Sequence, residues 1–306
     1  NNWGHCRLSG CFWEKQCNKL FYMRTRFYNF KVGADFKLPS RKKLFKKMGE
    51  YDTLAEYTVC ALRDFEKKWD RKTKFEDYVT QKAIEHSVNL RGGVTLPNHE
   101  PALYKSFMVN SHALLGDFIQ SYKLDIRSLI DPNFKLCDTD GLSNVEKLVR
   151  ALKTNNIVPN FPKWLLPLLD YYRLLRNSTA HVQEDEDRCM KAYLKIPLGE
   201  FEKDYPIFKG KAPNMPDSIT MNDFYLYSAS IKHFANFLTM ALKGKVKWAE
   251  LGAIHPDFDV RNIPKGTDII AKINSVLFTK YNYHPTKDEF EQIKNYIKEH
   301  KHSSTH

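Results

Sequence analysis

Long stretches of this chain carry apolar residues at the three- and four-residue spacing of an amphipathic helix, and few stretches alternate as strands do. A helix that Asp52 or Thr53 can cap places Leu54, Tyr57 and Ala61 at that spacing. Similar runs cover residues 74–90, 102–122, 162–181 and 222–242. This periodicity most constrains the fold, because each such helix must bury one face against another helix.

Short polar pairs mark where some of these helices begin. A side chain at the helix start and another three residues later can satisfy each other's backbone N–H groups, which otherwise lack partners. The pairs are Ser143 with Glu146, Thr220 with Asp223, and Thr286 with Glu289. They predict helices that start near residues 144, 221 and 287.

We therefore predict an all-α fold, a helical bundle with a less regular basic N-terminal segment and additional C-terminal helices. The expected parts are a basic, aromatic-rich segment at 1–51, a helical domain at 52–245 and a C-terminal helical extension at 246–306. Two helices are expected in the extension, around 267–281 and 286–300. Aromatic and basic residues alternate within 20–32, as in a short strand or hairpin.

The composition favours a soluble protein of the reducing cytoplasm. A membrane-spanning helix needs roughly 20 apolar residues, whereas the apolar runs here are only a few residues long and the mean hydropathy is -0.54. Six cysteines are unremarkable in 306 residues. His5, Cys6, Cys11 and Cys17 crowd the front, but their spacing is not that of common zinc sites, so we expect no metal and no cofactor. The chain begins with Asn1, which leaves a removed targeting segment open.

Positive charge is concentrated at the front of the chain. The formal net charge is +12, and residues 1–75 carry +10 of it. The sharpest cluster consists of Arg41, Lys42, Lys43, Lys46 and Lys47. Such a cluster favours a polyanionic partner, RNA above all, through counterion release. A solvated basic face or a basic arm is the alternative.

The stretch YYRLLRNSTAHVQ, residues 171–183, places several polar residues in a helix that should be buried. Arg176 and His181 form the one R-x4-H spacing in the chain. Chance alone predicts roughly half such a match, but roughly 0.03 once an Asn such as Asn177 must follow the Arg. The motif therefore calls for an explanation.

Helical geometry places the motif residues unevenly. At about 100° per residue, Arg173, Asn177 and His181 form one stripe, while Arg176 lies about 140° from His181. Arg173 is a candidate phosphate contact or, equally, the partner of Asp170 in a surface ion pair. A purely structural explanation also exists, since Arg and His near a helix C-terminus interact well with its dipole.

The acidic run Glu184–Asp187 follows the motif, and we expect a solvated loop there. This run or Asp170 could neutralise Arg176. His112 lies within a predicted helix, and we expect a hydrogen-bonded core histidine.

The RNSTAH stretch, late in a helix of an all-α bundle, resembles the R-N-x-x-x-H signature of the HEPN superfamily. Many members of that superfamily are metal-independent ribonucleases of toxin–antitoxin, abortive-infection and CRISPR-associated systems. A weaker similarity links CRLSGCFW to the YRLSGY-like stretch of the abortive-infection AbiD/AbiF group. Cys6 and Cys11 stand at the aromatic positions of that stretch, and Val182 stands where the group often has a second His.

The resemblance implies that Arg176, Asn177 and His181 are catalytic. It implies an endoribonuclease that leaves 2′,3′-cyclic phosphate and 5′-OH ends, in phage defence or as a toxin. It also implies a homodimer with a composite active site, since one His per chain is a sparse acid–base set, and it leaves room for an antitoxin or regulatory partner. The alternatives are a non-catalytic HEPN-like module that binds RNA or protein, and a DNA-binding or scaffold protein.

Overall fold

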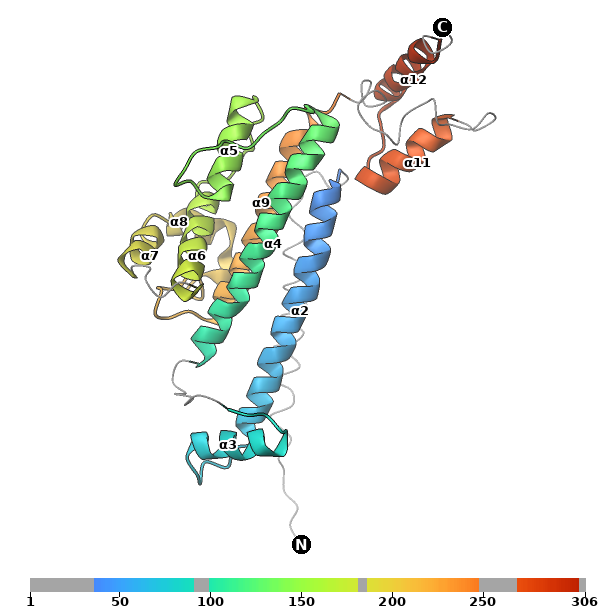
Figure 1. Ribbon diagram of the computed structural model, residues 1–306. Coiled ribbons are helices and arrows are strands. Elements are labelled where there is room, and N and C mark those ends of the chain that lie inside the picture. Colours follow the sequence, from blue (N-terminus) through green and yellow to red (C-terminus); the bar gives the residue numbers. More distant parts are fainter. Residues whose placement is uncertain (1–35, 91–98, 181–185, 248–268, 303–306) are drawn as a thin grey trace. The chain divides into compact units, whose positions relative to one another are not determined.

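The computed structural model describes residues 36–90, 99–180, 186–247 and 269–302, and this part of the chain is all-α, as predicted. In chain order the elements are α2 (Pro39–Lys67), α3 (Phe75–Glu85), α4 (His99–Leu129), α5 (Asn144–Thr154), α6 (Leu165–Ala180), α7 (Glu186–Tyr193), α8 (Leu198–Asp204), the 3₁₀ turn η2 (Pro206–Phe208), α9 (Met221–Lys243), α11 (Ile269–Tyr281) and α12 (Lys287–His302) (Figure 1). None of the helices in these ranges combines the length and the apolarity needed to cross a membrane. The hairpin expected at 20–32 and the front cysteines lie outside the described residues.

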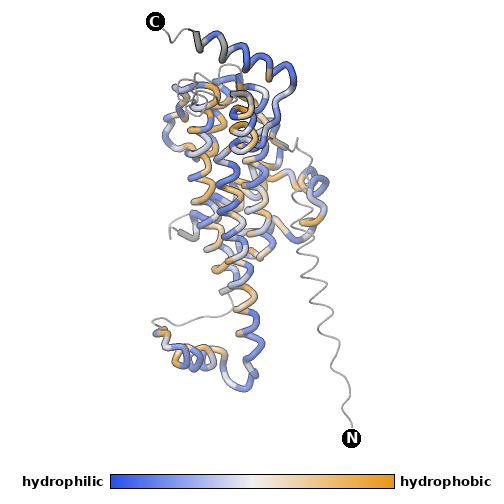
Figure 2. Tube along the Cα trace, turned by 90° about the vertical axis from the view of Figure 1, so that its right-hand side faces the viewer, coloured by the Kyte–Doolittle hydropathy of each residue, from blue (hydrophilic) through white to orange (hydrophobic). Residues whose placement is uncertain are grey.

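Three long helices, α2, α4 and α9, pack side by side and hold the core (Figure 1). Hydrophobic and hydrophilic residues alternate along them turn by turn (Figure 2), as their helical periodicity requires. Helix α9 is the most buried, with Ile231, Phe234 and Leu238 fully inaccessible to solvent. The hydroxyl of Tyr122 in α4 donates to the carbonyl of Leu238 over 2.9 Å, which fastens the two helices together. Helix α6 packs on both α4 and α9, and it carries the motif.

The predicted start of the first helix at residue 52 is wrong, because α2 already begins at Pro39. Leu38 is the N-cap residue and provides no side-chain cap, so the polar pattern that reveals other helix starts is missing. Proline in the first helical turn has no N–H to satisfy, which suits that position. The backbone N–H of Ser40 donates to the buried carboxylate of Asp125 in α4. The expected boundary at 51/52 therefore falls inside a continuous helix.

Asp52 is a buried tertiary contact and caps no helix. It is 7% exposed, and its carboxylate accepts hydrogen bonds from Ser228 over 2.8 Å and from the Lys232 ammonium over 2.5 Å, both in α9. A buried carboxylate must be paired, because removing a charge from water costs several kcal/mol. This network therefore fixes the register of α2 against α9.

The three capping pairs are confirmed. The Ser143 N–H donates to Glu146, and the Glu146 N–H donates back to the Ser143 hydroxyl. The pairs at residues 220 and 286 form in the same way and open α9 and α12. Each cap acts within three residues, which is why the sequence alone located it.

The C-terminal helices α11 and α12 are confirmed, and α11 contacts the segment that starts α2. The N–H of Lys37 donates to the carbonyl of Tyr281 over 2.7 Å, and the rings of Phe36 and Tyr281 stack with centroids 6.2 Å apart. The ammonium of Lys42 donates to the carbonyls of Thr279 and Lys280 at the end of α11. A cation there complements the carbonyl end of the helix dipole.

We predict that breaking the buried pair from one side costs far more than removing it whole. Asp52→Leu removes the carboxylate that neutralises the buried Lys232 ammonium, and the free energy of unfolding should fall by about 3–5 kcal/mol. The double variant Asp52→Leu, Lys232→Met should recover most of that loss. Urea unfolding followed by circular dichroism measures both, with Glu50→Gln in the exposed Lys47–Glu50 pair as the control that changes little. Equal losses in the single and double variants would contradict this assignment.

Candidate functional site

Helix α6 is held by its buried aromatic residues, and this anchoring sets which way its polar face points. Tyr171 and Tyr172 are fully buried, as is Leu175 one turn later. The hydroxyl of Tyr171 donates to the carbonyl of Asn214, and that of Tyr172 donates to the carboxylate of Asp223 at 3.0 Å. The adjacent Arg173 and the later Arg176 are only partly buried.

Asp223 ties α6 to the start of α9. It has no solvent-accessible surface, and it accepts hydrogen bonds from Tyr172, from the N–H and side-chain amide of Asn214, and from the N–H of Thr220. The sequence predicted the local bond to Thr220 but not the tertiary bonds.

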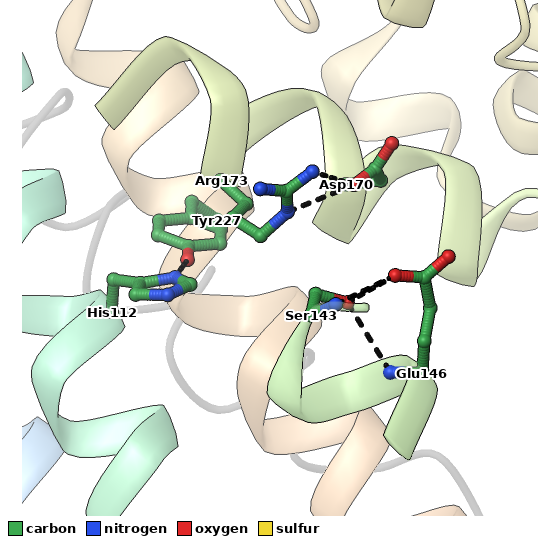
Figure 3. Close-up of polar contacts among 6 residues, drawn as sticks. All are labelled: His112, Ser143, Glu146, Asp170, Arg173 and Tyr227. Carbon is green, nitrogen blue, oxygen red and sulfur yellow. Dashed lines mark hydrogen bonds and ion pairs between the residues drawn. The ribbon is translucent and has the colours of Figure 1, made fainter. Parts of the chain in front are cut away.

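Arg173 forms the ion pair that the sequence offered as one of its two roles. Its Nε and one terminal nitrogen donate to a single oxygen of Asp170, over 2.9 Å and 2.8 Å, within α6 (Figure 3). The pair is only partly exposed, with 25% of the Arg173 side-chain surface accessible. Asp170 is therefore engaged by Arg173, one turn along the same helix.

Arg176 differs from Arg173, because no carboxylate among the described residues pairs with it. Its Nε is buried, and no hydrogen-bond acceptor among the described residues reaches it. No carboxylate of the described residues forms an ion pair with Arg176 either. A buried donor without an acceptor is rare and costly, and costlier when the group is charged. The arrangement favours an anion as the missing partner.

His112 in α4 lies beside this pair of arginines, although it is far from them in the sequence. Its Nδ1 is 2.7 Å from the hydroxyl of Tyr227, a completely buried residue of α9 (Figure 3). Burial, together with the smaller effects of the positive charges of Arg176 and Arg173, lowers the pKa of His112 to about 4. The imidazole is therefore neutral at pH 7.

The sequence identified His112 only as a core histidine. The hydrogen bond to Tyr227 agrees with that prediction, but the ring also lines a cavity together with Arg173. No spacing in the sequence could indicate this, because α4 and α6 meet through tertiary packing.

Of the two other predicted catalytic residues, the structure describes Asn177 but not His181. Asn177 is half-buried and stands one turn after Arg173. His181 lies outside the described residues, so the composite site remains a prediction. The loop predicted for the acidic run is wrong for Glu186 and Asp187, because they begin α7. Acidic residues stabilise a helix N-terminus, which explains the error.

The basic cluster predicted to bind RNA lies in the first turns of α2 and is partly used by the fold. Arg41 donates to the Asn236 side chain and lies 4.3 Å from the centroid of the Phe45 ring, while Lys42 binds the end of α11. The other three side chains of the cluster are exposed, namely Lys43, Lys46 and Lys47. Lys47 forms an ion pair with Glu50. The charge that faces solvent is therefore smaller than the sequence count suggests.

Within the described ranges, no group of three or more His, Cys, Asp or Glu side chains is arranged to hold a metal ion. A scan against models of known protein families finds no match, and searches of curated proteins and of solved structures find none either.

We predict that His112 makes the protein less stable in acid. A histidine whose pKa is lowered by folding stays neutral in the folded state, while the unfolded chain takes up a proton below about pH 6.5. The stability that the neutral His112 ring contributes is thus fully present above about pH 6.5 and is lost as the pH falls toward 4. Between pH 7.5 and pH 5 the wild type should lose about 2 kcal/mol more than His112→Asn, as measured by urea unfolding at both values.

Comparing the wild type with His112→Asn cancels the contributions that other titrating groups make to the pH dependence of stability. His233 has a pKa lowered to about 4 by burial and acts in the same direction, whereas Asp125, with a pKa raised to about 6 by burial, acts in the opposite one. The exposed His86 provides the matched control, and His86→Asn should keep the wild-type slope. An unchanged slope in His112→Asn would show that this ring is not held neutral.

Proposed function

We propose that this protein is a cytoplasmic, metal-independent RNA endonuclease with Arg176, Asn177 and His181 as its catalytic residues, acting in phage defence or as a toxin. One observation carries the proposal. Arg176 is partly buried, its Nε finds no acceptor among the described residues, and it precedes His181 by five positions. A phosphodiester would supply the acceptor and the negative charge that this guanidinium lacks.

The surroundings of Arg176 support an anionic substrate. Arg173 adds a second positive charge, and Asp170 offsets only one of the two. His112 and Tyr227 contribute no charge, because the imidazole is neutral and the phenol is buried. Arg173 is paired with Asp170 and also acts on the Glu146 carboxylate, so the charge left for a phosphodiester to balance is that of Arg176.

The side chains suit cleavage that uses the nucleophile of RNA itself. His181 takes the proton of the 2′-OH, the 2′-oxygen forms a bond to phosphorus, and the bond from phosphorus to the 5′-oxygen breaks. The leaving 5′-oxygen receives a proton from a protonated histidine. The products are a 2′,3′-cyclic phosphate and a 5′-OH. Arg176 stabilises the charge that develops on the phosphoryl oxygens, and Asn177 donates a hydrogen bond from the same helix end.

A homodimer would supply the second histidine. One imidazole cannot be base and acid in the same instant, so two copies of His181 facing one cleft would complete the acid–base pair. Twofold symmetry then brings two copies of Arg176 to the same cleft and raises its positive potential.

We predict that full-length protein cuts mixed RNA in the presence of EDTA. Arg176→Ala and His181→Ala should each lower the rate at least about 100-fold, the usual scale for losing a general acid–base group or a charge-stabilising donor. Gel electrophoresis measures cleavage, and mass spectrometry identifies the cyclic phosphate. The exposed Arg188 and His86 give matched controls, since their alanine variants should cut as the wild type does.

Two results of this assay would contradict the proposal. Equal cutting by the wild type and the motif variants would show that the site lies elsewhere. A wild type that leaves every RNA intact would favour a non-catalytic module that binds RNA or protein.

We further predict that an inactive subunit lowers the activity of the wild type if the site is composite. A heterodimer of the wild type and His181→Ala brings one imidazole to the shared cleft, so it lacks one member of the acid–base pair. After subunit exchange in an equal mixture, half of the dimers are heterodimers and a quarter are wild-type homodimers, so activity should fall to about half that of the same amount of wild type alone. Activity that stays unchanged after subunit exchange would show that each subunit acts alone.

A further inference from the structure

A pocket of about 360 Å³ lies between α4, α5, α6 and the turn that follows α7. This volume is at the lower end of the range of about 300–1,000 Å³ that small-molecule pockets span, so it suits one small group rather than a folded segment. It is lined by His112, Leu115, Ser143, Val145, Glu146, Val149, Arg150, Leu166, Pro167, Leu169, Asp170, Arg173 and Lys195.

The walls of the pocket are of two kinds. Apolar side chains from all three helices, such as Leu115, Val149 and Leu166, form surfaces that a flat apolar group can contact. Arg150 and Lys195 are exposed cations. The apolar walls therefore suit the ring of a ligand, and the cations suit a negative group attached to it.

Two carboxylates add hydrogen-bond acceptors. Glu146 uses Oε2 to accept from the N–H and hydroxyl of Ser143, and Asp170 uses Oδ1 to accept from Arg173 (Figure 3). No hydrogen bond within the described residues engages Glu146 Oε1 or Asp170 Oδ2. Burial alone would raise the pKa of Glu146, but the Ser143 bonds and the charges of Arg173 and Arg150 outweigh it and lower the pKa. Glu146 is therefore ionised and accepts hydrogen bonds only.

The pocket lies beside the candidate site. His112 and Arg173 line it, and the positive charge of Arg176 acts on His112. This neighbourhood makes the pocket a candidate place for the base of a nucleotide whose phosphate binds Arg176.

We propose that the pocket binds one guanine nucleotide of the RNA substrate and sets where the chain is cut; this inference rests on the proposed nuclease function. The apolar walls contact the base, and Glu146 accepts from its Watson–Crick edge. Guanine presents two neighbouring donors there, N1–H and the 2-amino group, and the acceptors that the pocket offers them are the two unengaged oxygens among the described residues, Glu146 Oε1 and Asp170 Oδ2. Proteins read single-stranded RNA through such edges of unstacked bases.

The test uses binding without cleavage. Fluorescein-labelled 2′-O-methyl RNA hexamers cannot be cut, because the attacking hydroxyl is blocked. Three hexamers differ at one position, which carries guanine, inosine or adenine; inosine lacks only the 2-amino group. Fluorescence anisotropy with the full-length wild type should show guanine bound about 5- to 100-fold more tightly than adenine, the usual discrimination of a bidentate pair, with inosine in between.

Two variants tie that preference to the pocket. Glu146→Gln keeps the capping box, which accepts Gln at this position, so α5 still starts normally. It should reduce the guanine preference to less than about 2-fold. Val149→Phe fills the pocket and should abolish the preference, whereas Val158→Phe, at a residue 74% exposed, should keep it. Equal binding of the three hexamers by the wild type, or a preference that survives Val149→Phe, would overturn the proposal.

The experiment separates this inference from the nuclease function and from a free ligand. Guanine-dependent binding without any RNA cleavage supports the pocket and rejects the nuclease. Cleavage that is indifferent to guanine and to Glu146→Gln supports the nuclease and rejects the pocket. Displacement of the hexamer by 5′-GMP at or below the Kd of the hexamer would identify a free-nucleotide site and overturn the assignment to RNA.

Discussion

The buried carboxylate of Asp223 is the constraint on which the geometry of the site depends. It joins the N-terminus of α9, the loop residue Asn214 and the α6 residue Tyr172 at a point that solvent does not reach. Because Tyr172 is fixed there, α6 cannot rotate about its axis, and Arg173 and Arg176 keep their orientation. Helix α4 packs on both α6 and α9, and this packing places His112 near the two arginines.

Among the described residues, the charges in the helical bundle are paired at two places, and a third charge has no counter-charge. Asp52 and Lys232 neutralise each other between α2 and α9, and Arg173 is neutralised by Asp170. Arg176 has no counterpart among the described residues. Folding tolerates such a group only when the rest of the structure holds it in place, and sites that bind ions commonly contain one.

The sequence predicted what depends on neighbours along the chain and missed what depends on tertiary packing. The caps at Ser143 and Thr220 and the Arg173–Asp170 pair all lie within a helical turn, and each formed as expected or as one expected alternative. The role predicted for Asp52 is wrong because the sequence alone does not distinguish a buried carboxylate from one that caps a helix. His112 was undervalued because α4 meets α6 only in three dimensions.

The contact between the start of α2 and the end of α11 has a consequence for the order of folding. Residues 36–42 and 279–283 lie near opposite ends of the described chain, so closing that contact orders a very long loop. Contacts of high sequence separation form late, after the local helices and the bundle have condensed. We therefore expect the docking of α11 to be a late step of folding, completed through the ring of Phe36 and the ammonium of Lys42. Local opening of this contact would then leave the helices around Arg176 folded.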